Sequence, residues 1–154
     1  MNPRRIPPWL GLGARLLLGG LFILAALPKL ADPPGFAKAV WNYNLVPAGL
    51  LSATALTLPW LELLCGLALV AGRWVRPAAA WVAILLLGFM AALGINLVRN
   101  HPVDCGCFAT SGAGRPAAER LRDMKLDLAR DAGILALALL ALGSDERSKP
   151  DRRP

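Results

Sequence analysis

The hydrophobic residues of this chain are gathered in long stretches, and most of its charged residues lie between those stretches. Three stretches, residues 9–30, 48–72 and 78–98, are long enough to cross a bilayer, which takes roughly 20 apolar residues in a helix. Each is followed by a polar or proline-containing segment. The pattern therefore predicts three membrane-spanning helices.

A fourth helix is predicted from about residue 117, where charged and apolar residues are interleaved before a purely apolar end. That end, 132–143, is too short to span a bilayer alone, so the span must include the turns that hold Asp127 and Arg130. These two residues lie three apart on one helical face and are predicted to pair. The expected fold is all-α, an integral membrane four-helix bundle.

The predicted spans contain small and helix-bending residues at particular places. Residues 29–47, with several prolines, are interpreted as a connector. Pro59 falls inside the second span and is expected to kink it or open its backbone locally. Gly88, Ala92 and Asn96 recur every four residues, which predicts a face for close helix packing with Asn96 hydrogen-bonded across helices.

Polar segments flank the membrane domain, 9–143: a basic N-terminal tail, 1–8, and a C-terminal tail, 144–154, that is predicted to be disordered. A cleaved signal peptide is the rival interpretation of the first apolar stretch. Arg15 interrupts that stretch and no clean small-residue cleavage site follows it, so we favour an uncleaved helix.

Composition supports a membrane protein. The 154 residues are 56% hydrophobic, and 17 Lys and Arg against 10 Asp and Glu give a net charge of +7. The basic residues sit between apolar stretches, which favours anionic lipid headgroups as their partner. No basic stretch has interleaved aromatic residues for stacking on bases, so nucleic acid is not expected as a partner.

Four spans place both termini on one side of the membrane. The very short basic hairpin 73–76 shares that side, which the positive-inside rule assigns to the cytoplasm. The loop between the third and fourth helices then faces outside, where disulfides form and persist.

That loop carries the motif Asp104-Cys105-Gly106-Cys107-Phe108. A disulfide between Cys105 and Cys107 would close a very small ring, which stabilises little and strains the bond, and strained disulfides exchange readily. A redox pair is therefore favoured over a structural staple. A soft-metal site and two incidental thiols stay open, although one histidine and no second cysteine pair make a closed four-ligand site hard to build.

Glu62 is the second candidate, because an ionisable group in the middle of a span is costly and usually functional. It would handle protons or contact a quinone. Alternatively, it forms a structural ion pair with Arg130, Lys29 or Arg15. Cys65 shares its face and is interpreted as a packed side chain.

Two further residues have weaker signals. Lys29 is expected to extend its ammonium to the interface, or to pair with a substrate anion or Asp104. His101 either lowers a cysteine pKa and relays protons, or is a solvated loop side chain.

Several segments together resemble the MauE branch of the DoxX-like membrane proteins, over roughly residues 16–142. They are Ala-Leu-Pro-Lys-Leu-Ala-Asp-Pro at 26–33 with Phe36, Tyr-Asn-Leu-Val-Pro at 43–47, Leu-Pro-Trp-Leu-Glu-Leu at 58–63 with Gly66, Asn-Leu at 96–97 and Asp-Cys-Gly-Cys-Phe at 104–108. The resemblance implies a four-helix bundle in the bacterial inner membrane that acts in periplasmic thiol–disulfide chemistry. It also implies an arginine in the last span, matched by Arg130, and some relatives look quinone-coupled. The family often has Gly after the Phe of the motif, where this chain has Ala109.

The leading hypothesis is a membrane thiol–disulfide oxidoreductase. Cys105 and Cys107 would exchange electrons with a periplasmic thioredoxin-like or client protein, and a membrane quinone would couple to them near Glu62 and Arg130. The alternative is a non-enzymatic assembly factor that holds a client or a soft metal at the loop. A transporter built on Glu62 is a third hypothesis, which would need a homodimer because one chain has no evident internal repeat.

Overall fold

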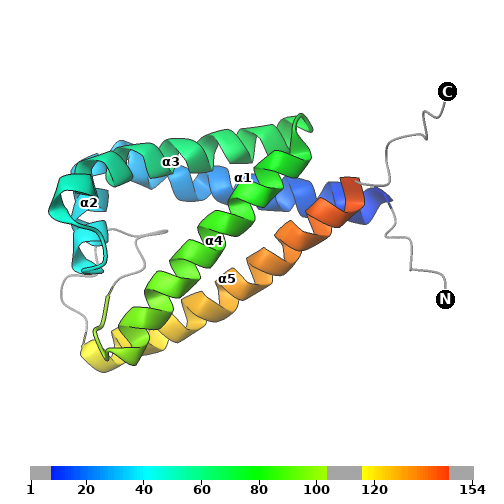
Figure 1. Cartoon of the computed structure of the whole chain (residues 1–154). Coiled ribbons are helices and arrows are strands. Elements are labelled where there is room, and N and C mark those ends of the chain that lie inside the picture. Colours follow the sequence, from blue (N-terminus) through cyan, green and yellow to red (C-terminus); the bar gives the residue numbers. More distant parts are fainter. Residues whose placement is uncertain (1–7, 104–115, 146–154) are drawn as a thin grey trace.

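A computed structural model of the chain describes residues 8–103 and 116–145, and every element in this part is helical (Figure 1). The helices are α1 (Pro8–Ala31), α2 (Pro33–Asn42), α3 (Ala48–Ala71), α4 (Val75–Val98) and α5 (Ala117–Asp145). The all-α prediction is confirmed.

Three of the described helices can cross a membrane by length and composition: Trp9–Ala31, Ala48–Ala71 and Val75–Val98. They match the first three predicted spans, and α3 continues as one helix through Pro59. The predicted fourth span is not confirmed: α5 has 29 residues but is not among these helices, since its N-terminal half is rich in charge. It nevertheless packs along α4 and against α1.

The short helix α2 corrects the interpretation of residues 29–47 as a connector. Asp32 caps the helix, its side chain accepting a hydrogen bond of 3.0 Å from the Gly35 amide. Pro33 follows at the first helical position, where its fixed φ favours a helix and its missing N–H costs nothing. The Asp-Pro pair is a local signal for the start of a helix, but the several prolines of this segment favoured a connector instead.

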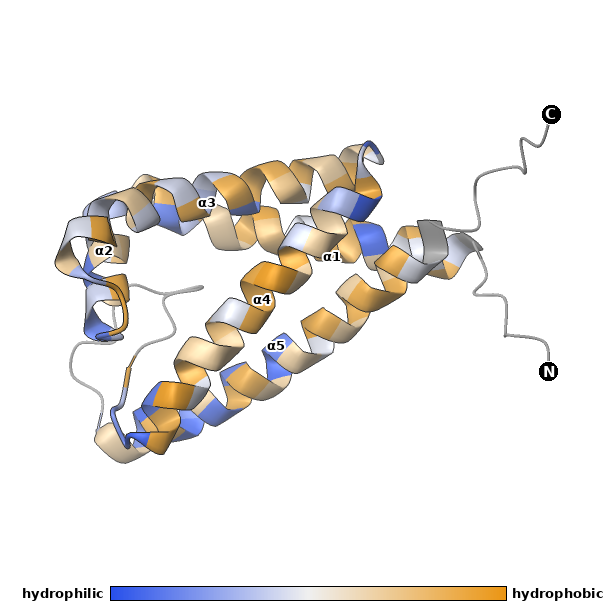
Figure 2. Ribbon diagram, viewed as in Figure 1, coloured by the Kyte–Doolittle hydropathy of each residue, from blue (hydrophilic) through white to orange (hydrophobic). Residues whose placement is uncertain are grey.

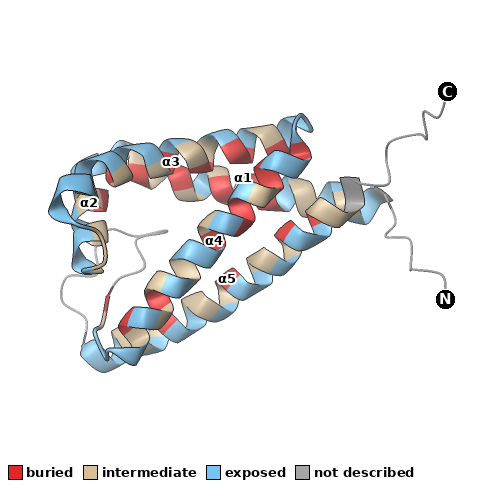
Figure 3. Cartoon of the chain, viewed as in Figure 1, coloured by how far each residue is buried: buried red, intermediate tan, exposed pale blue. Residues whose placement is uncertain are grey.

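The long helices form two antiparallel pairs, α1 with α3 and α4 with α5 (Figure 1). All four contribute to one apolar core, which includes Phe22, Leu69, Val82 and Ala138. Away from this core the α4–α5 pair diverges from α1 and α3 in the view of Figure 1, and α2 lies at the separated end. Figure 3 shows the buried residues on the facing sides of the helices.

The closest helix approach that the glycines show is between α1 and α3, and not at the predicted face of Gly88 and Ala92. A Cβ on Gly19 of α1 would lie 2.8 Å from the Gly66 carbonyl of α3, and one on Gly66 would lie 2.9 Å from the Gly19 carbonyl. By contrast, a Cβ on Gly88 would meet no atom within 4 Å. The predicted packing face of Gly88 and Ala92 therefore leaves space instead of making a tight contact.

Hydrophobic residues predominate along the three apolar helices (Figure 2), and many of their large apolar side chains are exposed. Exposed examples on α3 and α4 are Leu56, Trp60, Leu64, Ile84 and Leu87. Such a continuous apolar surface fits contact with lipid tails and not with water.

The glycine contact gives a first prediction. Gly66→Ala should lower the melting temperature in detergent, because overpacking a tight contact costs about 1–3 kcal/mol. The matched control is Gly20→Ala on α1, where a Cβ meets no atom within 4 Å. It should leave the melting temperature unchanged or raise it, since Ala is the better helix former. Circular dichroism would measure both, and equal shifts would contradict the assigned contact.

Candidate functional site

A buried ion pair joins α1 to α3. Lys29 Nζ lies 2.7 Å from each carboxylate oxygen of Glu62, and both residues are 1% exposed. This geometry satisfies both oxygens of the carboxylate with one donor. The expectation that Lys29 extends to the interface is therefore wrong, because its ammonium points inward to a carboxylate.

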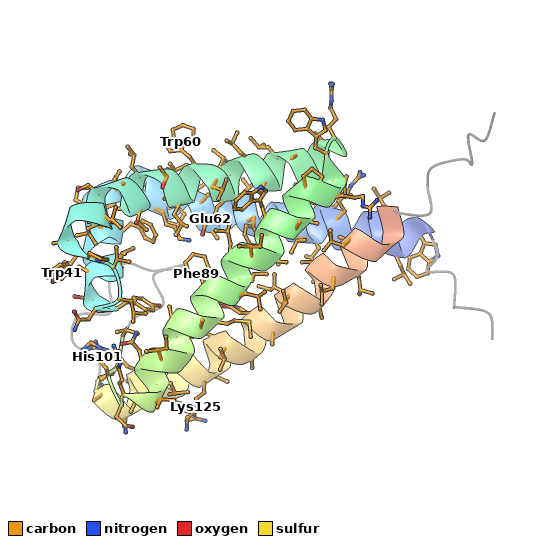
Figure 4. All side chains as sticks on the ribbon, viewed as in Figure 1. Trp41, Trp60, Glu62, Phe89, His101 and Lys125 are labelled. Carbon is orange, nitrogen blue, oxygen red and sulfur yellow. The ribbon has the colours of Figure 1, made fainter. Side chains whose placement is uncertain are left out.

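Two aromatic rings complete the surroundings of the ammonium. Lys29 Nζ lies 5.2 Å from the ring centroids of both Phe36 on α2 and Phe89 on α4. These distances are within the range of cation–π attraction. In Figure 4, Glu62 and Phe89 come from α3 and α4 into the interior of the molecule. Four helices thus meet around one positive charge.

The other proposed partners of Glu62 lie elsewhere. Arg130 pairs with Asp127 at 2.9 Å and Asp131 at 3.1 Å, all on α5. The predicted Asp127–Arg130 pair is confirmed, whereas Asp131, which is 4% exposed, was missed. The Arg15 guanidinium lies against Gly72, since a Cβ there would be 2.8 Å from Arg15 Nη1. Glu62 is thus placed in a structural pair, one of the alternatives open from the sequence.

An apolar cavity of about 240 Å³ lies between α2, α3 and α4. Phe36 and Phe89 belong to its wall, so they separate the cavity from the Lys29 ammonium. The small residues Gly88 and Ala92 also line it, which explains the space left at Gly88. We call this space the apolar cavity.

Asn96 connects α4 to the end of α2. Its side-chain amide donates to the Tyr43 carbonyl at 3.2 Å and to the Ala92 carbonyl at 3.0 Å. Its oxygen lies 3.1 Å from His101 Nδ1. The predicted hydrogen bond of Asn96 across helices is confirmed, and His101 is held by this contact although its ring is exposed.

A second, polar cavity of about 440 Å³ lies beside these residues, and we call it the loop-side cavity. Its walls come from the end of α2, the segment after α4 and the start of α5. The lining residues are Trp41, Asn42, Asn44, His101, Pro102, Val103 and Arg120. Arg120 Nη2 donates a hydrogen bond of 2.7 Å to the Pro102 carbonyl, which ties α5 to the segment after α4.

The cysteine motif itself, with Asp104, Cys105 and Cys107, lies outside the described residues. The chain is described up to Val103, which is buried and packs with Leu93 and Met124. Cys65 is buried in the core as expected for a packed side chain, and it is a free thiol. Within residues 8–103 and 116–145, no three His, Cys, Asp or Glu side chains are grouped as metal ligands.

These features define a small α-helical integral membrane protein with a buried Lys–Glu pair and a cysteine pair in the sequence just after a spanning helix. The chain belongs to the MauE family, since the family model described as methylamine utilisation protein MauE matches residues 7–144. The wider link to DoxX-like proteins stays a prediction.

Curated relatives agree with this assignment. A methylamine utilization protein MauE of Paracoccus denitrificans is 36% identical over 135 residues, covering 87% of this chain and 69% of the relative. Those of Methylophilus methylotrophus and Methylorubrum extorquens are 37% and 39% identical, over 53% and 48% of their own lengths. The chain thus spans about half the length of these last two relatives. No solved structure matches it.

The ion pair gives a second prediction. Glu62→Leu and Lys29→Met should each lower stability by about 3–5 kcal/mol, because each leaves an unpaired buried charge. The double variant Lys29→Met/Glu62→Leu should recover much of that loss. Unfolding in detergent, followed by circular dichroism, would give the coupling free energy. If the two losses simply added, the pair would not be a stabilising unit.

Proposed function

We propose that this protein is a membrane thiol–disulfide oxidoreductase acting in methylamine utilisation, with Cys105 and Cys107 as its redox pair. The observation that carries the proposal is a Cys-Gly-Cys motif directly after a spanning helix in a chain of the MauE family. Its partner would be a periplasmic thioredoxin-like or client protein.

The chemistry is disulfide exchange. A thiolate on one protein attacks a sulfur of a disulfide on the other, and that S–S bond breaks as the mixed disulfide forms. The second thiolate of the attacking pair then attacks its neighbouring sulfur in the mixed disulfide. The bond between the two proteins breaks, and a disulfide forms within the attacking pair. Two electrons and two protons have passed from the dithiol to the disulfide, and no further reactant is consumed. The same steps run in either direction.

The arrangement of the helices supports a periplasmic loop. α1 begins and α5 ends at one end of the molecule, and α4 ends at the other (Figure 1), where Asn96 is hydrogen-bonded to the Tyr43 carbonyl at the end of α2. The basic hairpin at 73–76 is at the opposite end of α4 from the motif. The proposal takes both termini and the hairpin to be cytoplasmic and the motif to be periplasmic, the orientation that the positive-inside rule favours for a bacterial inner membrane.

A quinone headgroup is the ligand that we propose for the apolar cavity, whose wall includes Phe36 and Phe89 with the Lys29 ammonium behind them. A bound quinone would supply a two-electron acceptor for the cysteine pair. The chain's own part is to shield the headgroup from water and to hold a cation at one wall. The Lys29–Glu62 pair keeps that cation in place, whereas Arg130 has its own partners on α5.

The cysteine pair gives a third prediction. Protein purified without reductant and alkylated should show Cys105 and Cys107 protected until reductant is added, with mass spectrometry locating each label. Cys105→Ser and Cys107→Ser should abolish exchange with a reduced thioredoxin-like protein, because each removes one of the two sulfurs. The matched control, Cys65→Ser, removes a thiol in the core and should keep exchange.

Full exchange activity in both motif variants would overturn the proposal. Stoichiometric copper or zinc on the purified protein, lost in the motif variants, would instead favour the assembly factor that holds a metal. A client retained by the serine variants would favour the assembly factor that holds a client.

A further inference from the structure

We propose that the loop-side cavity binds an extended peptide segment of the client protein and presents the client cysteine to the Cys105–Cys107 pair. This inference rests on the proposed thiol–disulfide exchange and adds the place where the client is held. It concerns a different space from the apolar cavity, which has another wall composition.

The connectivity of the chain keeps the motif close to this cavity. Val103 is a wall residue and is buried against Leu93 and Met124, so it is fixed in the fold. Cys105 follows Val103 by two positions in the sequence and Cys107 by four, and an extended chain advances at most about 3.6 Å per residue. A cysteine on a segment seated in the cavity is therefore within reach of the motif.

The chemistry of the lining fits a polypeptide backbone. Asn42 and Asn44 each offer an amide donor and an amide oxygen, the groups that pair with backbone C=O and N–H of an extended segment. Trp41 is 52% exposed and offers an apolar ring face to a side chain of the segment. A lipid tail would leave these amides without partners, so it does not fit this space.

The size of the cavity also fits a short segment. Its volume of about 440 Å³ lies within the range of roughly 300–1,000 Å³ common for ligand sites. Trp41, Asn42 and Asn44 are exposed wall residues in the described part of the chain.

The walls are held in position before any client binds. Asn96 joins the Tyr43 carbonyl to His101, and Arg120 joins α5 to the Pro102 carbonyl. Asn44 and Asn100 adopt positive φ values of 51°, a left-handed conformation that Asn tolerates better than most residues. A preformed site loses less entropy when it orders a peptide.

The test compares two substrates with the same leaving group. One is a nine-residue uncharged peptide of Ala, Gly and Ser, whose central cysteine carries thionitrobenzoate as a mixed disulfide. The other is Ellman's reagent, which has no peptide. In each case the reduced cysteine pair gives two electrons to the probe disulfide and becomes a disulfide itself. The absorbance of released thionitrobenzoate gives the rate in detergent.

The variant Trp41→Ala/Asn42→Ala/Asn44→Gly, made in a Cys65→Ala background, removes the proposed peptide contacts. Glycine at position 44 keeps the positive φ without strain. We expect the rate with the peptide to fall about tenfold, as for the loss of two or three neutral hydrogen bonds. The rate with Ellman's reagent should stay unchanged. The matched control is Trp60→Ala in the same background, since Trp60 on α3 is also 52% exposed and lies outside the cavity.

Two results would overturn the inference: an unchanged rate with the peptide, or an equal fall with both substrates. If the wild-type cysteines react with neither substrate, the proposed function fails, and the cavity is then judged by binding alone. The fluorescence anisotropy of a labelled peptide with serine in place of the cysteine should rise when wild-type protein is added and not when the triple variant is added. If the peptide bound equally to the wild-type protein and the triple variant, or to neither of them, the inference would be overturned.

Discussion

A charge buried inside a membrane protein has to be matched by an opposite charge, and the Lys29–Glu62 pair meets this requirement here. The two residues lie on α1 and α3, and the rings of Phe36 and Phe89 bring α2 and α4 to the same ammonium. Residues of four helices thus surround the pair, and both of its members are buried. The pair therefore sets how four helices are arranged around the wall of the apolar cavity.

The close contact of Gly19 with Gly66 and the shared apolar core hold the helices together at one end, whereas α2 lies where the two helix pairs separate. Two cavities of opposite character lie next to α2, one lined by apolar side chains and the other by amides, an indole and a guanidinium. We propose a lipid-soluble ligand for the first cavity and a polypeptide segment for the second. Both cavities border the same short helix, and the Asn96 hydrogen bonds tie its end to the segment after α4.

Much of the fold and part of the site were predictable. The three apolar spans followed from hydropathy, since bilayer thickness sets their length. The Asp127–Arg130 pair followed from helical spacing alone, and the need for a partner at Glu62 followed from the cost of a buried charge. Helix α2 was not predicted, although its Asp-Pro cap is a local signal. Helix α5 was predicted as a fourth span, although its many charged residues make it less apolar than the other three long helices.

The sequence by itself determined the helical class, the three apolar spans and the position of the cysteine pair after the third, because each depends on residues near one another in the chain. Only the tertiary structure decided that Lys29, and not Arg130 or Arg15, neutralises Glu62, because these candidates are far apart in sequence and the choice depends on how helices pack. The same holds for the Gly19–Gly66 contact and for the two cavities. Small residues at Gly88 and Ala92 favour a tight contact and an open space equally, and only the neighbouring helices decide which of the two forms.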